Sequence, residues 1–337
     1  MSTPGPASPA APEPLPALLP LRLGISACLL GERVRYDGGD KRAPLLCDVI
    51  ACGVQWVPIC PEVEIGLGTP RPPMVLLRSE RGARLWTPDS GTDHTRPMRA
   101  WARERVSELA EQQVAGYVLK SRSPSCGLRG VPLHDAQGPT LASGRGLFAA
   151  ALTRALPLLP VAEEHELEDP AMLTQFLRRA FFYRRWQRRH EPLTNFHRRH
   201  RALLLASGAA ATRRLDRALA AGEGEDAGFA DRYGRDALRL LRHVPSRRSH
   251  ARNLGWAVGH LVVHVGDRQR RQNVEAYRAY ARGELPWAQA AVVLRRSAQD
   301  VGHQGVMESA YLFPEPAEWE LLVHLDRLQT PECAPVN

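Results

Sequence analysis

The sequence has few cysteines and no long apolar run, and each shortage excludes a class of protein. Six cysteines among 337 residues are too few for a disulfide scaffold. None of them forms a CxxC pair, so zinc-ribbon and common ferredoxin patterns are excluded. No uninterrupted apolar run is long enough to span a bilayer. We therefore expect a protein of the reducing cytoplasm that has no membrane anchor.

The first 20 residues, MSTPGPASPAAPEPLPALLP, lack a basic start and are interrupted repeatedly by proline. This composition is typical of a disordered Pro/Ala-rich tail, and it fits neither a signal peptide nor an anchor.

Lysine is also scarce and occurs only at Lys41 and Lys120. The formal net charge is nevertheless +9. The positive charge is therefore almost entirely arginine. Such a balance favours anionic partners, including nucleic acid bound through an Arg-rich helical region. The alternative, which we prefer, is that the arginines form solvated faces and reflect a GC-rich coding bias.

Strand-like and helix-like runs alternate between residues 21 and 160. The strand-like runs are LRLGISACL, VQWVPIC and AGYVLK, and the helix-like runs are APLLCDVIAC and MRAWARERVSELAEQQV. Alternation of this kind predicts an α/β domain with a Rossmann-like parallel sheet. From Met172 onward the pattern is helical. We therefore expect a connecting helical segment at 161–190 and an all-α domain at 191–330.

Three cysteines follow the three strand-like runs: Cys28, Cys60 and Cys126. If the runs are neighbouring parallel strands, the three thiols meet at the carboxyl edge of the sheet. Three thiolates can hold a metal or a cluster and leave one position free for a substrate. The alternative is that each packs as a small hydrophobic residue. Proline and glycine around Cys60 and Cys126 indicate exposed loops and favour ligation.

The other three cysteines are interpreted as non-ligands. Cys47 and Cys52 lie in a stretch with helical spacing, and Cys333 lies in the polar tail.

Five motifs occur along the chain in the following order: SACLLGERVRYDGGDKR, CPEVEIGLGTPRPPMVL, SGTDHTRPMRAWA, LKSRSPSCG and GRGLFAAAL. They resemble the thiouracil desulfidase (TudS) family over about residues 20 to 160. The resemblance implies a 4Fe–4S cluster held by three cysteines, with one open iron. It also implies removal of sulfur from a thiolated pyrimidine base or nucleotide without net redox change. By motif, the cluster ligands are Cys28, Cys60 and Cys126.

The reaction that this resemblance implies needs a base for the attacking water and an acid for the ring nitrogen. Glu62, two residues after Cys60, is our first candidate for the catalytic carboxylate. Asp37 in RYDGG is the second candidate, and a plain turn residue is its alternative role.

The loop around Cys126 supplies further candidates. We expect Ser123 to take part in catalysis, and Lys120, Ser121 and Ser125 to bind the uracil edge or the cluster sulfides. Arg35 is also assigned to substrate binding.

If the substrate is a nucleotide, Lys41 and Arg71 join Arg35 as candidates for holding its phosphate, with a solvated charge as the alternative for each. The SGRG turn, Ser143–Gly146, is interpreted as a tight strand-to-helix turn rather than an anion site.

Four motifs of the helical half resemble the YbgA-type helical domain, which is often fused to a desulfidase domain. They are PLTNFHRRHRALLLA, RNLGWAVGHL, YRAYARGELPWAQA and SAYLFPEP. The family's string NVLxHxxGYF is replaced here by one that begins at Asn253, and Ser207 stands where a histidine is usual. The purpose of this half is left open by the sequence.

Some histidine and aromatic side chains in the helical half are spaced as in a metal site or a base-stacking surface. The pairs His197/His200 and His260/His264 share helix faces, but structural or surface roles are favoured over metal binding. Tyr183, Trp186 and Phe196 are interpreted as core or interface aromatics rather than base-stacking platforms.

The sequence therefore predicts a non-redox desulfidase that acts on thiolated uracil or its nucleotide. Two alternatives stay open. One is desulfuration of thiolated tRNA, and the other is a nucleic-acid-associated binding protein with a degenerate enzyme domain. The oligomeric state is not predicted.

Overall fold

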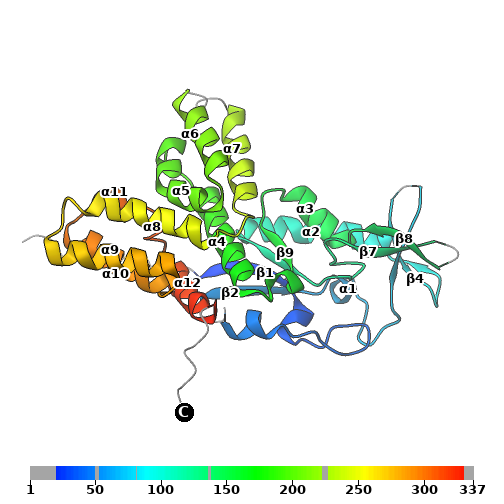
Figure 1. The fold of residues 1–337 in the computed structure, drawn as a ribbon. Coiled ribbons are helices and arrows are strands. Elements are labelled where there is room, and N and C mark those ends of the chain that lie inside the picture. The colour runs from blue at the N-terminus through cyan, green and yellow to red at the C-terminus, as the bar shows by residue number, and fades with distance from the viewer. Residues whose placement is uncertain (1–19, 50–52, 81, 136–137, 222–226, 330–337) are drawn as a thin grey trace, which may run out of the picture.

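The computed structural model describes residues 20–49, 53–80, 82–135, 138–221 and 227–329. Figure 1 shows an α/β part and a helical part that meet around one long helix, α4. The predicted fold class, an α/β region with a parallel sheet followed by an all-α region, is confirmed. The predicted tail of residues 1–19, Cys52 and Cys333 lie outside the described residues.

The central sheet is four-stranded, parallel and ordered β2-β1-β6-β9. Its strands are β1 (Leu21–Ser26), β2 (Val54–Ile59), β6 (Tyr117–Leu119) and β9 (Val161–Glu163). Strand β1 is buried on both faces except at Arg22: Leu21, Leu23 and Ile25 on one face are 0 % exposed, and Gly24 and Ser26 on the other are also buried. Burial on both faces explains why this strand appears in the sequence as a nearly continuous apolar run. The fourth strand, β9, was not anticipated.

Helices α2 (Thr95–Glu111) and α3 (Leu147–Ala155) pack against each other. Buried side chains of α2 recur every three or four residues, at Met98, Ala102, Val106 and Leu109. This spacing places them on the helix face that is turned toward the core. The helix expected over APLLCDVIAC is different, because within the described residues this segment forms only a short π-helical turn, η2 (Leu45–Val49).

A second, mixed sheet lies at the far end of the α/β part, ordered β5-β4-β3-β7-β8. Its strands are β3 (Val75–Leu77), β4 (Arg84–Thr87), β5 (Thr92–Asp93), β7 (Val131–Asp135) and β8 (Gly138–Gly144). A small separate core lies beneath it, with Leu76, Leu85 and Met98 at its centre. The strand-like runs recognised in the sequence do not include the strands of this sheet.

Short helical turns connect the strands to the site described below. They are η1 (Ala27–Leu30), α1 (Pro61–Glu64) and η3 (Glu164–Leu167).

The helical part begins with α4 (Pro170–Gln187), whose N-cap Asp169 accepts a 2.8 Å hydrogen bond from the amide of Ala171. Asp at the N-cap followed by Pro at the first helical position is a favourable helix start. The remaining helices are α5 (Leu193–Ser207), α6 (Ala209–Ala220), α7 (Ala227–Leu240), α8 (Arg247–Leu261), α9 (Asp267–Arg282), α10 (Trp287–Asp300), α11 (Gln304–Met307) and α12 (Pro316–Gln329).

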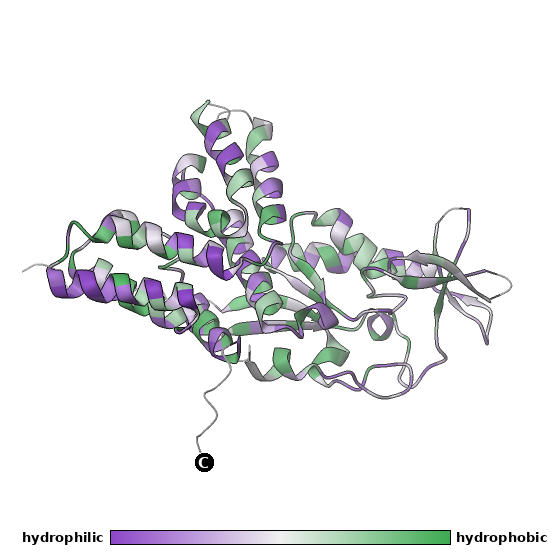
Figure 2. Ribbon diagram, viewed as in Figure 1, coloured by the Kyte–Doolittle hydropathy of each residue, from purple (hydrophilic) through white to green (hydrophobic). Residues whose placement is uncertain are grey.

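The last helix, α12, returns to the α/β part, where it packs against α4 and η2. A Cβ atom at Gly53 would lie 3.1 Å from the side chain of Leu321, so α12 closely approaches the residue that precedes β2. Figure 2 shows hydrophobic residues in the central strands and prominent hydrophilic residues along α9. One continuous core therefore extends through both parts.

Candidate active site

The three predicted cysteines lie along one edge of the central sheet. Cys28 belongs to η1, directly after β1, and Cys60 directly follows β2 as the N-cap of α1. Cys126 lies in the loop that follows β6. All three line one cavity of about 400 Å³. The expectation that parallel strands bring these thiols together therefore matches the geometry, although ligation itself stays a prediction.

Burial governs the acidity of the three thiols. It raises the pKa of Cys28 to about 12, with a further contribution from Cys60. Burial also raises the pKa of Cys60 and, more strongly, that of Cys126, although a hydrogen bond with Ser26 opposes the shift of Cys126. Three thiolates therefore need a compensating positive charge in this cavity. A bound metal centre supplies such a charge and binds the deprotonated form.

The donor set fits a cluster better than a single ion. Among the described residues, no group of three or more His, Cys, Asp or Glu side chains converges closely enough for one metal ion. A cluster has one iron for each cysteine and therefore needs no convergence on one point. Within the described part of the chain, no His or further Cys lines the cavity, so the lining would offer a cluster three thiolates and no imidazole.

Cys47 does not belong to this set. Its thiol faces the carbonyl oxygen of Leu29 at 3.4 Å, and it is absent from the cavity lining. This arrangement agrees with its interpretation as a non-ligand.

Glu62 lies in the first turn of α1 and lines the cavity. Its Oε2 forms an ion pair with Arg71, whose Nε lies 3.0 Å away, and its Oε1 accepts a 2.9 Å hydrogen bond from Ser125. Arg71 is itself held by the carbonyl oxygens of Val34 and Gly68. The structure therefore assigns Arg71 to orienting a carboxylate, whereas the sequence analysis considered it for phosphate binding. Both carboxylate oxygens of Glu62 are fixed in place.

Ser123 and Ser125 shape the loop that carries Cys126. The hydroxyl of Ser123 accepts hydrogen bonds from the amides of Ser125, at 3.2 Å, and Cys126, at 3.1 Å. Ser123 lines the cavity, whereas Ser125 is 0 % exposed and is directed at Glu62. Ser125 therefore acts on the carboxylate, and Ser123 is the hydroxyl of the pair that faces the cavity.

The start of α3 holds the same loop in place. The amides of Leu147 and Phe148 donate hydrogen bonds to the carbonyl oxygens of Pro124 and Ser125. At Gly146, a Cβ atom would lie 2.4 Å from the carbonyl oxygen of Ser125, so only glycine permits this approach. These amides are thus used internally. This supports the interpretation of SGRG as a tight turn rather than an anion site.

Lys120 and Ser121 line the cavity but are held from behind by Glu164, the first residue of η3. The ammonium of Lys120 forms an ion pair with Glu164, and the amide and hydroxyl of Ser121 each donate to it at 2.7 Å. Burial acts to raise the pKa of Glu164, but hydrogen bonds from Lys120 and Ser121 outweigh it and lower the pKa. Local sequence patterns do not indicate this carboxylate, because it lies more than 40 residues from both partners.

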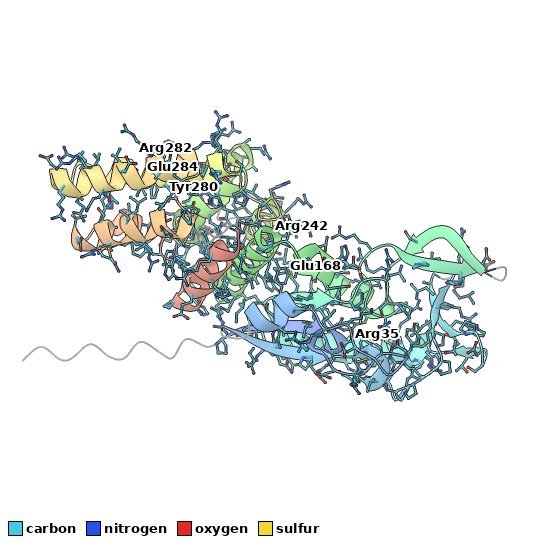
Figure 3. The ribbon with its side chains drawn as sticks, turned by 60° about the horizontal axis from the view of Figure 1, so that its bottom comes forward. Arg35, Glu168, Arg242, Tyr280, Arg282 and Glu284 are labelled. Carbon is cyan, nitrogen blue, oxygen red and sulfur yellow. The ribbon has the colours of Figure 1, made fainter. Side chains whose placement is uncertain are left out.

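Asp37 has the geometry of a turn residue. Its Oδ1 accepts a 3.0 Å hydrogen bond from the amide of Gly39, its side chain is 44 % exposed, and it is absent from the cavity lining. Arg35 lies 3.6 Å from Asp37 and does line the cavity, as does Lys41. Figure 3 labels Arg35 on the side of the molecule that holds the central sheet. Of the two candidate carboxylates, only Glu62 lines the cavity.

The chain resembles known proteins over this region. Residues 23–164 match the family model described as 2-thiouracil desulfurase. A solved structure, the 4Fe–4S-dependent thiouracil desulfidase TudS, is 33 % identical, and the match covers 44 % of this chain and 93 % of that one, with a TM-score of 0.36. The uncharacterized protein YbbK of Bacillus subtilis (strain 168) is 28 % identical over 150 residues, which are 43 % of this chain and 97 % of that protein.

Residues 23–164 therefore form a domain of the 2-thiouracil desulfurase family. Residues 201–316 match a second family model, described as a protein of unknown function (DUF1722). The predicted pairing of a desulfurase domain with a YbgA-type helical domain is therefore confirmed.

In the helical part, the aromatic residues and histidines considered above have structural partners. Tyr183 and Phe196 are buried, and Trp186 packs on Phe196, which confirms their core assignment. His197 binds Tyr233 at 3.0 Å and Asp216 at 2.7 Å, while His200 binds Arg185 at 2.9 Å.

His260 and His264 both lie against the ring of His303. These three histidines form no metal-binding group of described residues. No described helix of this chain is both long enough and apolar enough to cross a membrane.

Proposed function

We propose that this protein removes sulfur from thiolated uracil, as the free base or its nucleotide, with water as the second reactant and hydrogen sulfide as the product. One observation carries the proposal. Three cysteines from separate segments and the oriented carboxylate of Glu62 line the same cavity. Membership of the 2-thiouracil desulfurase family supports the reaction class.

Cys28, Cys60 and Cys126 are the residues that would hold a 4Fe–4S cluster. When bound, a cluster with one open iron supplies a thiophilic Lewis acid at the substrate sulfur. Arg35, Lys41 and Lys120 line the same cavity and offset the negative charge of the thiolates. The remaining chemistry belongs to side chains of the chain itself.

Glu62 is the proposed general base. It accepts a proton from the water that adds to the ring carbon bearing sulfur, and the C–S bond then breaks. The ion pair with Arg71 occupies Oε2, so Oε1, held by Ser125, is the oxygen available for that proton. A protonated Glu62 then returns the proton to the departing sulfide or to the ring nitrogen. Water supplies the oxygen and both hydrogens, so the reaction has no net redox change.

The substrate-binding roles follow from which groups face the cavity. The hydroxyl of Ser123 is placed to donate to the carbonyl or ring positions of a uracil. The ammonium of Lys120 already donates to Ser121 and Glu164, so it contributes its positive charge to the cavity. Arg35 and Lys41 suit the phosphate of a nucleotide. Asp37 is not assigned a catalytic role in this proposal.

The test is an anaerobic assay of the purified chain with its cluster reconstituted. 2-Thiouracil, 4-thiouridine monophosphate and thiolated tRNA are supplied separately, and loss of thiocarbonyl absorbance is followed with release of sulfide. We expect turnover of the base or the nucleotide. Turnover of tRNA alone would move the proposal to the polymer, and no turnover of any of the three by cluster-loaded protein would refute it.

A further inference from the structure

A second cavity, of about 600 Å³, lies where the α/β part meets the helical part. Its walls come from α3, β9, η3 and α4 and from Arg242, just after α7. Figure 3 labels Arg242 and Glu168, which lie at this junction. Among the described residues, no side chain lines both this cavity and the cysteine cavity. The two are therefore separate sites.

Arg179 is the central feature of this cavity. It is only 8 % exposed, and its Nε is buried without a hydrogen-bond partner. In the described part of the chain, no carboxylate forms an ion pair with it. Burial, with Arg242 as a second cause, lowers the pKa of this guanidinium to about 10. A buried charge without a partner is costly, so a counter-charge at this position would be strongly favoured.

Glu166, the acidic residue in the described lining, already has two partners. Its Oε1 accepts a 2.8 Å hydrogen bond from Arg129, and its Oε2 accepts one of 2.8 Å from the amide of Glu163. Its charge attracts Arg179 and partly offsets the effect of burial, but among the described residues the two form no ion pair.

The remaining charges of the lining are positive. They are Arg129, Arg145, Arg179 and Arg242, so the cavity carries four arginines against one carboxylate. Arginines held together repel one another, and an anion placed between them removes this repulsion and accepts paired hydrogen bonds.

We propose that this cavity binds a phosphorylated small molecule, with its phosphate between Arg179 and Arg242. The cavity volume is within the usual range for small-ligand sites. Apolar side chains such as Leu156 and Met172 complete the wall and suit the organic part of the ligand. The buried Oε1 of Gln175 has no partner and offers an acceptor for a ligand hydroxyl.

The second cavity adjoins the loop that carries the third cysteine. Leu128 and Arg129, which line it, follow Cys126 closely in the chain. Arg145, which also lines the cavity, holds the same segment in place, because its Nε donates a 3.1 Å hydrogen bond to the carbonyl oxygen of Leu128. A ligand in this cavity therefore stabilises a segment of the desulfurase domain, whether or not the desulfidase proposal is correct.

The experiment measures binding of inorganic phosphate, uridine monophosphate and uridine to the full chain by calorimetry. We expect both phosphate-bearing probes to bind and uridine to bind far more weakly. Arg242→Gln, an exposed position, should weaken phosphate binding by about 10-fold or more. Its matched control, Arg239→Gln, changes an exposed arginine one turn earlier on α7 and should bind as the wild type does.

Two further variants separate the sites. Arg35→Gln removes a cation proposed to hold the nucleotide phosphate in the cysteine cavity, and it should leave binding of inorganic phosphate at the second cavity intact. Arg179→Leu removes the buried charge, so it should fold at least as stably as the wild type while losing the rise in melting temperature that phosphate produces. The proposal is overturned if phosphate affinity is unchanged in Arg242→Gln, if it is lost in Arg35→Gln alone, or if uridine binds as well as its monophosphate.

Discussion

The hydroxyl of Ser125 donates a 2.9 Å hydrogen bond to Oε1 of Glu62, although the two residues are 63 positions apart in the sequence. Ser125 precedes Cys126, and Glu62 follows Cys60 by two residues. This single bond therefore links two of the cysteine-bearing segments and fixes the carboxylate between them. The first two predictions concern its two ends.

Glu62→Gln should keep the iron–sulfur content and abolish most of the turnover, because an amide cannot accept the proton of the attacking water. We expect kcat to fall about 10²- to 10⁴-fold. Iron and sulfide analysis and the thiocarbonyl assay measure the two quantities. Glu64→Gln is the matched control, since Glu64 lies on the same helix but faces Arg105 at 3.3 Å and does not line the cavity. Equal activity in Glu62→Gln and the wild type would exclude Glu62 as the base.

Ser125→Ala should lower kcat by about 10- to 100-fold, the usual loss for one hydrogen bond to a charged group. KM should change little, because Ser125 is buried and does not face the substrate. Steady-state kinetics separates the two constants, and Ser125→Thr should restore part of kcat by restoring the hydroxyl. An increase in KM without a loss of kcat would contradict this positioning role.

Each of Cys28→Ala, Cys60→Ala and Cys126→Ala should lose the cluster or hold it at a small fraction of the wild-type iron content. Cys47→Ala should retain it, because that thiol faces the carbonyl oxygen of Leu29 rather than the cavity. Iron content and the visible spectrum after anaerobic reconstitution provide the measurement. A full cluster in any of the first three variants would remove that cysteine from the ligand set.

Acidification should destabilise the fold through His200. Burial and the neighbouring Arg185 lower its pKa well below the ordinary value of 6.5. Its Nε2 accepts from Arg185, so it is neutral, with its proton on Nδ1 directed at the carbonyl oxygen of Phe196. Below pH 6.5 the unfolded chain binds a proton here that the folded chain does not. The free energy of unfolding should therefore fall by about 1.4 kcal/mol for each pH unit below 6.5 through this residue.

Urea titrations between pH 7.5 and 5 measure this effect. His200→Asn keeps a donor for the carbonyl of Phe196 and removes the titrating group, so its stability should depend less steeply on pH. The exposed His243, changed in the same way, serves as the control. An unchanged slope in His200→Asn would show that other groups cause the acid sensitivity.

The sequence predicts the central strands well, because their apolar runs are local signals. The segments that contain β1, β2 and β6, and the grouping of the three cysteines, follow from strand ends alone. Strand β9 is as short as β6, but its sequence VAE ends in a charged residue and follows Pro160, so it lacks the apolar run that marks β6. The second sheet has the same difficulty, since β3 and β5 contain three and two residues.

The site is only partly predictable for a different reason. Glu62 is suggested by its closeness to Cys60 in the chain, but its partners Arg71 and Ser125 are set by tertiary contacts. Glu164 is likewise distant in the sequence from Lys120, with which it forms an ion pair. Spacing rules describe neighbours on one helix or strand, so ion pairs between distant segments are not accessible to them.

The close packing of Leu321 against Gly53 affects whether the α/β part can be prepared as a separate fragment. Helix α12 belongs to the last stretch of the sequence, yet it rests beside the beginning of the strand that leads to Cys60. Cutting the chain after residue 164 would strip an apolar cover from that strand. The excised fragment would then expose surface that the intact polypeptide keeps from water, and we expect it to be prone to aggregation. The α/β part and the last helix are thus physically interdependent, although α12 extends beyond both matched family regions.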